Sequence, residues 1–162
     1  MEITVRPPTN ADIPRLVSLY EDGEREQVER KPIWALTDGL DERFDISLFH
    51  AISAEESWVL VGEIDGVIVG FLWATLEPMR ERAAGRRIGR IRLIYTEPEA
   101  RGVGVGHEML EAVLAEMRPL GIANFDAPAG PGQRATKNFF EAHGFAARSI
   151  IMHHEDSPDD DG

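Results

Sequence analysis

Six consecutive residues at positions 101–106 are the part of this sequence best suited to chemistry. They read Arg101-Gly102-Val103-Gly104-Val105-Gly106 and lie between an apolar run at 91–96 and a helical pattern. Glycines allow turns that a Cβ forbids, and they let backbone N–H groups approach a ligand closely. The first N–H groups of a helix lack intrahelical partners and carry the positive end of its dipole. The glycine bend at 101–106 therefore indicates a pyrophosphate site, and hence a nucleotide-bearing cofactor.

Three phosphate-binding patterns can be compared with this glycine bend. A P-loop needs Lys followed by Ser or Thr after its last glycine, whereas His107-Glu108 follows Gly106 here. A dinucleotide fingerprint that starts at Gly102 and Gly104 needs its third glycine at position 107, which is histidine. The sequence thus excludes the first pattern and disfavours the second. The third pattern, Arg-x-x-Gly-x-Gly between a strand and a helix, fits.

Hydrophobic periodicity and turn residues predict the elements that must position the bend. Two β-rich runs flank Asp65-Gly66, a dipeptide that favours a tight hairpin turn. The helix after the bend should face a sheet with Met109, Leu110, Val113, Leu114 and Met117. The full expected order is strand 2–6, helices 11–31 and 41–56, strands 57–64, 67–78 and 90–95, helix 104–117, strand 122–127, helix 133–144 and strand 145–154. This order predicts a mixed sheet covered by helices in a single α/β or α+β domain.

Composition narrows the kind of chemistry further. The chain has 162 residues, which suits one domain, and it has no cysteine, so disulfides, thiolate metal sites and cysteine nucleophiles are excluded. The histidines show no metal-ligand spacing with carboxylates, and we expect no metal site. The net charge of -12 argues against a nucleic-acid partner, because binding to phosphates supplies most of that affinity.

Localisation and domain limits follow from the distribution of apolar and acidic residues. No apolar run approaches the ~20 residues of a membrane span, and the start lacks the layout of a signal peptide, so we expect a cytoplasmic protein without membrane contact. The segment 155–162 holds five acidic residues and no basic one, and it should be a disordered tail. The predicted domain is therefore 1–154.

Two motifs in this order resemble those of one known family. The run IYTEPEARGVGVGHEML at 94–110 resembles the acetyl-CoA-binding motif of the GNAT superfamily of N-acetyltransferases, and ATKNFFEAHGF at 135–145 resembles that family's second motif. The resemblance covers about residues 2–154. It implies a mostly antiparallel mixed sheet of about six to seven strands flanked by about four helices. It also implies transfer of an acetyl group from acetyl-CoA to a primary amine of a small molecule or a protein.

The resemblance also assigns roles in cofactor binding. Main-chain groups of Ile94, Tyr95 and Thr96 would pair with the pantetheine arm as if it were an added strand. The pyrophosphate would bind the N–H groups of Arg101, Gly102, Val103, Gly104, Val105 and Gly106, with His107 at the helix start. On the later helix, Asn138 and Phe140 would lie near the cofactor's other side. Gln133 stands where the family often has asparagine, which implies a further contact.

The chemistry implied by the family is direct attack of a neutral amine on the thioester. A backbone N–H near Thr96 is the predicted oxyanion donor. Many family members protonate the thiolate with a tyrosine, but Phe140 occupies that position here and has no hydroxyl. Glu97 and Asp126 are the candidate bases, from their positions at the ends of predicted strands. Because a thiol has a pKa near 8.5, water can protonate the departing thiolate.

Two other functions remain open from the sequence. The missing hydroxyl at Phe140 suits a CoA-binding regulatory or interaction domain without catalysis, and the glycines alone would also suit a nicotinamide-binding oxidoreductase. The acceptor is undecided as well. Acidic residues at 21–26 favour a cationic amine, whereas Arg80, Arg82, Arg86 and Arg87 favour an acceptor with an anionic group. The family habit also suggests a homodimer.

Overall fold

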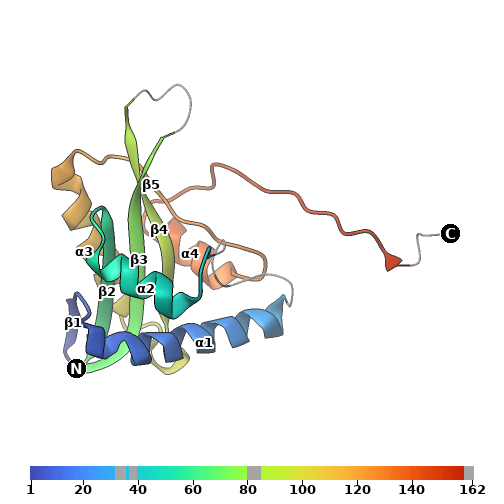
Figure 1. Cartoon of the computed structure of the whole chain (residues 1–162). Helices are drawn as coiled ribbons and strands as arrows, with labels where there is room; N and C mark the ends of the chain where they lie inside the picture. Colours follow the sequence, from blue (N-terminus) through green and yellow to red (C-terminus); the bar gives the residue numbers. More distant parts are fainter. Residues whose placement is uncertain (32–35, 37–39, 80–84, 159–162) are drawn as a thin grey trace.

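A computed structural model describes residues 1–31, 36, 40–79 and 85–158 of the chain (Figure 1). Within this part there are five strands, four α-helices and three short 3-10 helices. In chain order the elements are β1 (Ile3–Arg6), a 3-10 turn (Asn10–Asp12), α1 (Ile13–Arg30), α2 (Phe44–Ser53), β2 (Ser57–Ile64), β3 (Val67–Pro78), β4 (Arg87–Thr96), a 3-10 turn (Pro98–Ala100), α3 (Val105–Met117), a 3-10 turn (Arg118–Leu120), β5 (Phe125–Asp126) and α4 (Arg134–Ala142). The predicted α/β architecture with a mixed sheet is confirmed.

The sheet follows the order of the sequence, β1-β2-β3-β4-β5. The first four strands pair antiparallel, and β5 pairs parallel with β4. Asp65 and Gly66 join β2 and β3 with φ angles of 49° and 82°, as a two-residue hairpin turn requires. The predicted hairpin is therefore confirmed at its predicted bounds.

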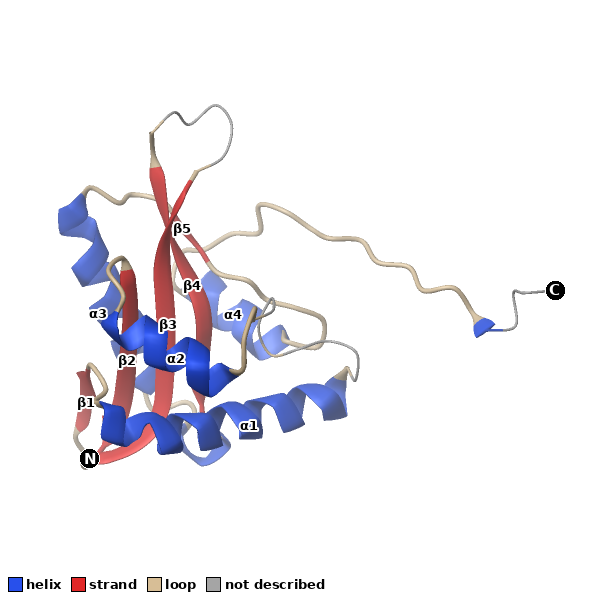
Figure 2. Ribbon diagram, viewed as in Figure 1, coloured by secondary structure: helices blue, strands red, loops and turns tan. Residues whose placement is uncertain are grey.

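Helices cover both faces of the sheet (Figure 2). On one face α1 and α2 pack over a cluster that includes Leu16, Leu48 and Phe71, and Tyr20 stacks on Phe44 with ring centroids 4.1 Å apart. On the other face lie α3 and α4, whose core includes all five predicted α3 residues and Phe140. All five α3 side chains are buried, which confirms the predicted face of this helix.

Three expectations about secondary structure are wrong. The segment 145–154 carries no strand, and β5 has two residues where 122–127 was expected, so the described sheet has five strands instead of six to seven. Helix α1 starts at Ile13, after a 3-10 turn, instead of near Ala11.

Some sequence-based expectations fall outside the described residues. Arg80 and Arg82 lie there, as does the end of the acidic segment at 159–162. Among the helices that the structure describes, none combines the length and the hydropathy of a membrane span.

Candidate functional site

The glycine bend joins the end of β4 to the start of α3. Gly102 and Gly104 have φ angles of +81° and +105°, and Gly104 is the N-cap residue of α3. These are left-handed conformations, which glycine adopts without the steric cost of a Cβ. Gly102 and Gly104 are therefore the two residues of the bend whose backbone conformation favours glycine.

The start of α3 leaves several N–H groups facing the bend. The first intrahelical hydrogen bond runs from the Glu108 N–H to the Gly104 carbonyl, at 3.0 Å. The N–H groups of Val105, Gly106 and His107 therefore precede the intrahelical ladder. With the positive end of the helix dipole, they make this end of the helix suited to an anion.

The edge of β4 beside the bend is not covered by β5. In the described residues β5 pairs only with Gly89 and Arg90, so β4 continues past it from Ile91 to Thr96. The Glu97 N–H donates to the Val69 carbonyl of β3 at 2.9 Å. Successive residues of a strand point their backbone N–H and C=O groups to opposite sides. The backbone groups of Tyr95 therefore also face β3, while those of Ile94 and Thr96 face the open edge. Of the three residues predicted to pair with a pantetheine arm, Ile94 and Thr96 thus have the required orientation, and Tyr95 does not.

Arg101 turns its side chain from the bend back toward α1. Its Nε donates to the Thr96 carbonyl at 2.8 Å, and its Nη2 lies 2.9 and 3.1 Å from the two carboxylate oxygens of Glu26. The Tyr95 hydroxyl donates to the same carboxylate at 2.7 Å. Burial, followed by this hydrogen bond to Glu26, raises the pKa of Tyr95, so the phenol stays protonated. The Arg101 N–H donates to the Pro98 carbonyl at 3.3 Å, so both the guanidinium and the N–H of this residue have partners within the chain.

Helix α4 packs against the start of α3 and brings the two sequence motifs together. A Cβ added to Gly106 would lie 3.3 Å from the Phe139 ring and 4.0 Å from Ile94 Cδ1. The His107 and His143 rings share a hydrogen bond of 2.8 Å between Nδ1 and Nε2, and His143 Nδ1 lies 2.8 Å from the Phe139 carbonyl. Sequence reasoning did not name Phe139 and His143 as site residues. The signal available for them was their place within the second motif.

The three residues predicted near the cofactor on or just before α4 differ in their exposure and in their contacts. Phe140 is 5% exposed and packs between Phe139 and Phe145, so it is a core residue. Asn138 is exposed. Gln133 is buried, and its amide already bonds to Gln27 Oε1 at 3.2 Å, to the Leu36 carbonyl and to the Gly130 N–H. The structure thus uses Gln133 to join α1 to the loop before α4.

The predicted bases are not brought together. Glu97 lies 3.0 Å from Arg15 of α1. Asp126 aligns with Arg90 and accepts two hydrogen bonds from Arg148 Nε, at 2.8 and 2.9 Å. Since Thr96 lies six residues further along β4, Asp126 is about 20 Å from it. Asp126 therefore does not face the predicted oxyanion donor, and both carboxylates are ion-paired.

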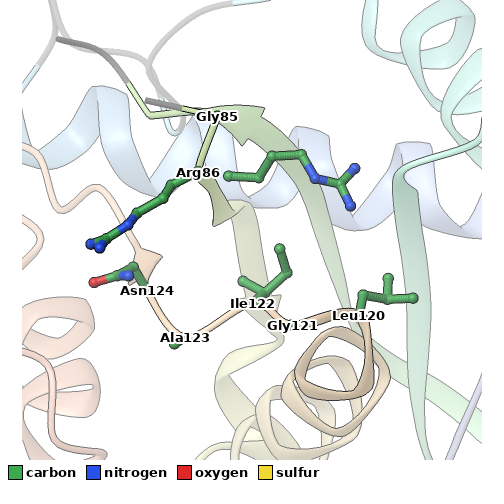
Figure 3. Close-up of a pocket in the computed structure, with 8 residues that line it drawn as sticks. Gly85, Arg86, Leu120, Gly121, Ile122, Ala123 and Asn124 are labelled. Carbon is green, nitrogen blue, oxygen red and sulfur yellow. The ribbon is translucent and has the colours of Figure 1, made fainter. Parts of the chain in front are cut away.

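A cavity of about 360 Å³ lies beside the start of β4 (Figure 3). It is lined by Gly85, Arg86, Arg87, Leu120, Gly121, Ile122, Ala123 and Asn124. Arg87 is also ion-paired with Glu56. Because β4 begins at Arg87 and ends at Thr96, this cavity is separate from the bend and the open edge of β4.

Comparisons with known proteins bear on this arrangement. The model of the acetyltransferase (GNAT) family matches residues 13–145. Mycothiol acetyltransferases from Cellulomonas flavigena and Thermobispora bispora are 27% and 31% identical over 94 and 90 residues, in each case 56% of this chain. The match covers only 27% and 30% of the length of those relatives.

Solved structures match nearly the whole fold. A mutant of the BH1408 protein from Bacillus halodurans has a TM-score of 0.80 and 19% identity, with 94% of this chain and 98% of that chain covered. AAC(6′)-Iy in complex with a CoA bisubstrate analogue has a TM-score of 0.72 and 14% identity, with 97% and 99% covered. At these identities the likeness shows the shared fold.

Proposed function

We propose that this chain, which belongs to the acetyltransferase (GNAT) family, transfers an acetyl group from acetyl-CoA to a primary amine. One observation carries the proposal: the open edge of β4 leads directly into the left-handed glycine bend and the start of α3. The edge offers hydrogen bonds to an extended amide-containing arm, and the bend offers N–H groups to a pyrophosphate. Coenzyme A joins these two chemistries in one molecule.

The residues present fit this cosubstrate. Ile94 and Thr96 would pair with the pantetheine arm, and the backbone of 102–106 with the start of α3 would hold the pyrophosphate. The space beside Gly102 and Gly104 supports this, because a Cβ at Gly102 would meet no atom within 4 Å and one at Gly104 only Ile3 Cδ1, at 3.8 Å. Phe139 lies against Gly106, in the first turn of α3. Acetyl-CoA supplies the activated acyl group as a thioester.

The chemistry we propose relies on positioning. The amine nitrogen bonds to the thioester carbonyl carbon, the C–S bond breaks, the nitrogen loses a proton to water and the thiolate takes one from water. The Thr96 N–H at the open edge would stabilise the developing oxyanion. Holding the two reactants in register supplies a large part of such accelerations. Glu97 and Asp126 are ion-paired with Arg15 and Arg148, which supports solvent as the base.

We also propose that the acceptor is a small molecule. The curated relatives are named for mycothiol, and AAC(6′)-Iy was solved with an analogue that carries acetylneamine; these are small molecules. The alternative is a CoA-binding regulatory domain without catalysis, which the absence of a hydroxyl at Phe140 favours. A cytoplasmic location and a domain spanning 1–154 belong to the same proposal.

Two measurements test the proposed function. Thermal unfolding with acetyl-CoA, CoA or NAD should show stabilisation by the first two ligands and none by NAD. Thiol release should then be followed with acetyl-CoA and a panel of polyamines, aminoglycosides and amino sugars. Binding without turnover on any amine would favour the regulatory domain, and stabilisation by NAD alone would refute a CoA site.

A further inference from the structure

Two histidines join the start of α3 to the end of α4. His107 is the third residue of α3, and His143 is the C-cap residue of α4. Their ring centroids lie 5.1 Å apart, and His107 Nδ1 and His143 Nε2 share a hydrogen bond of 2.8 Å. The second ring nitrogen of His143, Nδ1, lies 2.8 Å from the Phe139 carbonyl oxygen. A continuous chain of hydrogen bonds thus runs from His107 to the backbone of α4.

The Phe139 carbonyl determines where the hydrogens lie when both rings are neutral. A carbonyl oxygen can only accept a hydrogen bond, so His143 Nδ1 carries a hydrogen. A neutral imidazole has one N–H group, so His143 Nε2 is an acceptor and its bond to His107 requires a hydrogen on His107 Nδ1. His107 Nε2 is then left with a lone pair, which cannot donate to a phosphate oxygen.

One added proton changes His107 Nε2 from an acceptor into a donor without breaking a hydrogen bond. The proton adds to His107 Nε2, and the hydrogen between the rings shifts from His107 Nδ1 to His143 Nε2. The inter-ring bond and the bond to Phe139 both remain. A second proton would place hydrogens on both facing nitrogens and break the inter-ring bond. The pair is therefore built to hold one proton.

The ends of the two helices determine which ring carries the positive charge. His143 lies at the C-terminus of α4, where the helix dipole is negative, whereas His107 lies in the first turn of α3, where it is positive. The charge is therefore favoured on His143, and His107 becomes a neutral ring with an N–H at Nε2. Because helical side chains lean toward the N-terminus of their helix, the His107 ring covers the turn that begins at Gly104.

The charged side chains around the pair come from α3, α4 and the glycine bend. They are Glu108 and Glu111 in the first two turns of α3, Arg134, Lys137 and Glu141 on α4, and Arg101 in the bend. Lys137 is ion-paired with Glu141, and Arg101 with Glu26. In the described part of the chain, neither imidazole hydrogen-bonds to a charged side chain. The protonation of the pair therefore depends mainly on the inter-ring bond and on the two helix ends, and the α3 carboxylates favour it.

We propose that the His107–His143 pair takes up one proton when acetyl-CoA binds, and that His143 is a positioning residue that makes His107 Nε2 a donor to a pyrophosphate oxygen. This coupling rests on the acetyl-CoA site proposed above, to which it adds a dependence on pH. A bound state that holds one more proton is favoured as pH falls, so the dissociation constant should decrease toward acidic pH. Since histidine ordinarily titrates near pH 6.5, the change should fall between about pH 6 and 8.

Isothermal titration of the full chain with acetyl-CoA at pH 6, 7 and 8 tests the coupling. The measured quantity is the ratio of the dissociation constants at pH 8 and pH 6, and titration of the ligand's own phosphates affects every variant equally. His143→Asn keeps an amide that can donate to the Phe139 carbonyl but takes up no proton, so its ratio should be about tenfold smaller than that of the parent. His50→Asn, at an exposed histidine of α2 on the opposite face of the sheet, is the matched control and should keep the parent ratio.

The outcomes separate the pair from the cofactor site. Ratios for His143→Asn and the parent that agree within about twofold would overturn the role of the pair while leaving the acetyl-CoA site intact. Failure of the parent to bind acetyl-CoA at any of these pH values would refute the site itself.

Nuclear magnetic resonance can locate the imidazole hydrogens in the unmodified chain. Long-range correlations between ring protons and ring nitrogens should show hydrogens on Nδ1 of both His107 and His143 at pH 8 without ligand. At pH 6 with acetyl-CoA bound, His143 should carry hydrogens on both nitrogens and His107 on Nε2 alone. A hydrogen on His107 Nε2 at pH 8 without ligand, or a neutral His143 in the complex at pH 6, would overturn the proposal.

Discussion

A substitution at Gly102, compared with one at a matched glycine, separates the effect of the bend on cofactor binding from its effect on the stability of the fold. Gly102 has φ +81° and Gly121, after α3, has φ +83°. A Cβ built at either residue meets nothing within 4 Å. Alanine at either position therefore suffers the same backbone strain and no steric clash, but only Gly102 lies in the proposed pyrophosphate site. The two alanine variants form a matched pair.

The expected cost in stability is equal for the two variants. A left-handed conformation costs a residue with a Cβ about 1–2 kcal/mol relative to glycine. Alanine also lowers the conformational entropy of the unfolded chain, which offsets about 0.4–1 kcal/mol of this cost. A net loss of about 1 kcal/mol lowers the melting temperature of a chain of this size by roughly 2–4 °C. Both variants should show this shift in the absence of ligand.

The expected effect on binding differs. Relief of strain at Gly102 would turn the neighbouring N–H groups away from the pyrophosphate, and a hydrogen bond to a charged group is worth about 1.5–3 kcal/mol. Loss of one such bond weakens acetyl-CoA binding about 10- to 100-fold. Isothermal titration with acetyl-CoA measures the dissociation constant, and steady-state kinetics measure KM and kcat. Equal dissociation constants for Gly102→Ala and Gly121→Ala, within about twofold, would refute the assignment of the bend as a phosphate site.

Three further predictions concern single side chains. Phe140→Tyr should leave the rate of thiol release within about tenfold of the parent, and a much larger gain would show that the missing hydroxyl limits turnover. Tyr95→Phe removes one of the hydrogen bonds to Glu26 but leaves the ion pair with Arg101, so urea unfolding should show a loss of about 1 kcal/mol; a loss above about 3 kcal/mol would contradict this account. Hydrogen bonds from an arginine and a backbone N–H lower the pKa of Asp12 from 3.8 to about 2, so its stabilising effect should be complete above pH 4 and disappear as pH falls toward 2. The free energy of unfolding of Asp12→Asn, measured across this range, should lack that component, and a parallel pH profile for the two proteins would contradict the assignment.

Local signals explain the parts of the fold that the sequence predicted well. The β2–β3 hairpin follows from two β-rich runs around Asp65-Gly66, whose left-handed turn needs no distant partner. The buried face of α3 follows from apolar residues at a spacing of three and four, which end in Met117. In the bend, Gly102 and Gly104 have positive φ angles, which glycine adopts at a lower cost in free energy than residues with a Cβ. In each case the information lies within a few residues of the feature.

Features that depend on distant partners were predicted poorly. The segment 145–154 has the composition of a strand, but composition does not say which edge it pairs with, or whether that edge belongs to the same chain. Gln133 was predicted beside the cofactor from its position in a motif, whereas its amide bonds Gln27 and Leu36, about 100 residues earlier. Asp126 was a candidate base from its place at a strand end, and the register of β5 against Arg90 places it far from Thr96.

The acidic residues of α1 show that carboxylates grouped in the sequence can find their partners within the protein itself. In the sequence, these carboxylates favour a cationic acceptor. In the structure, Glu26 binds Arg101 and Tyr95, and Glu24 accepts the Leu36 N–H. Since Arg101 also holds the Thr96 carbonyl, the Glu26 carboxylate connects α1 to the strand end that carries the proposed oxyanion donor. A displacement of α1 that separates Glu26 from Arg101 would therefore release a contact on Thr96, which makes the position of this helix part of the geometry of the proposed reacting centre.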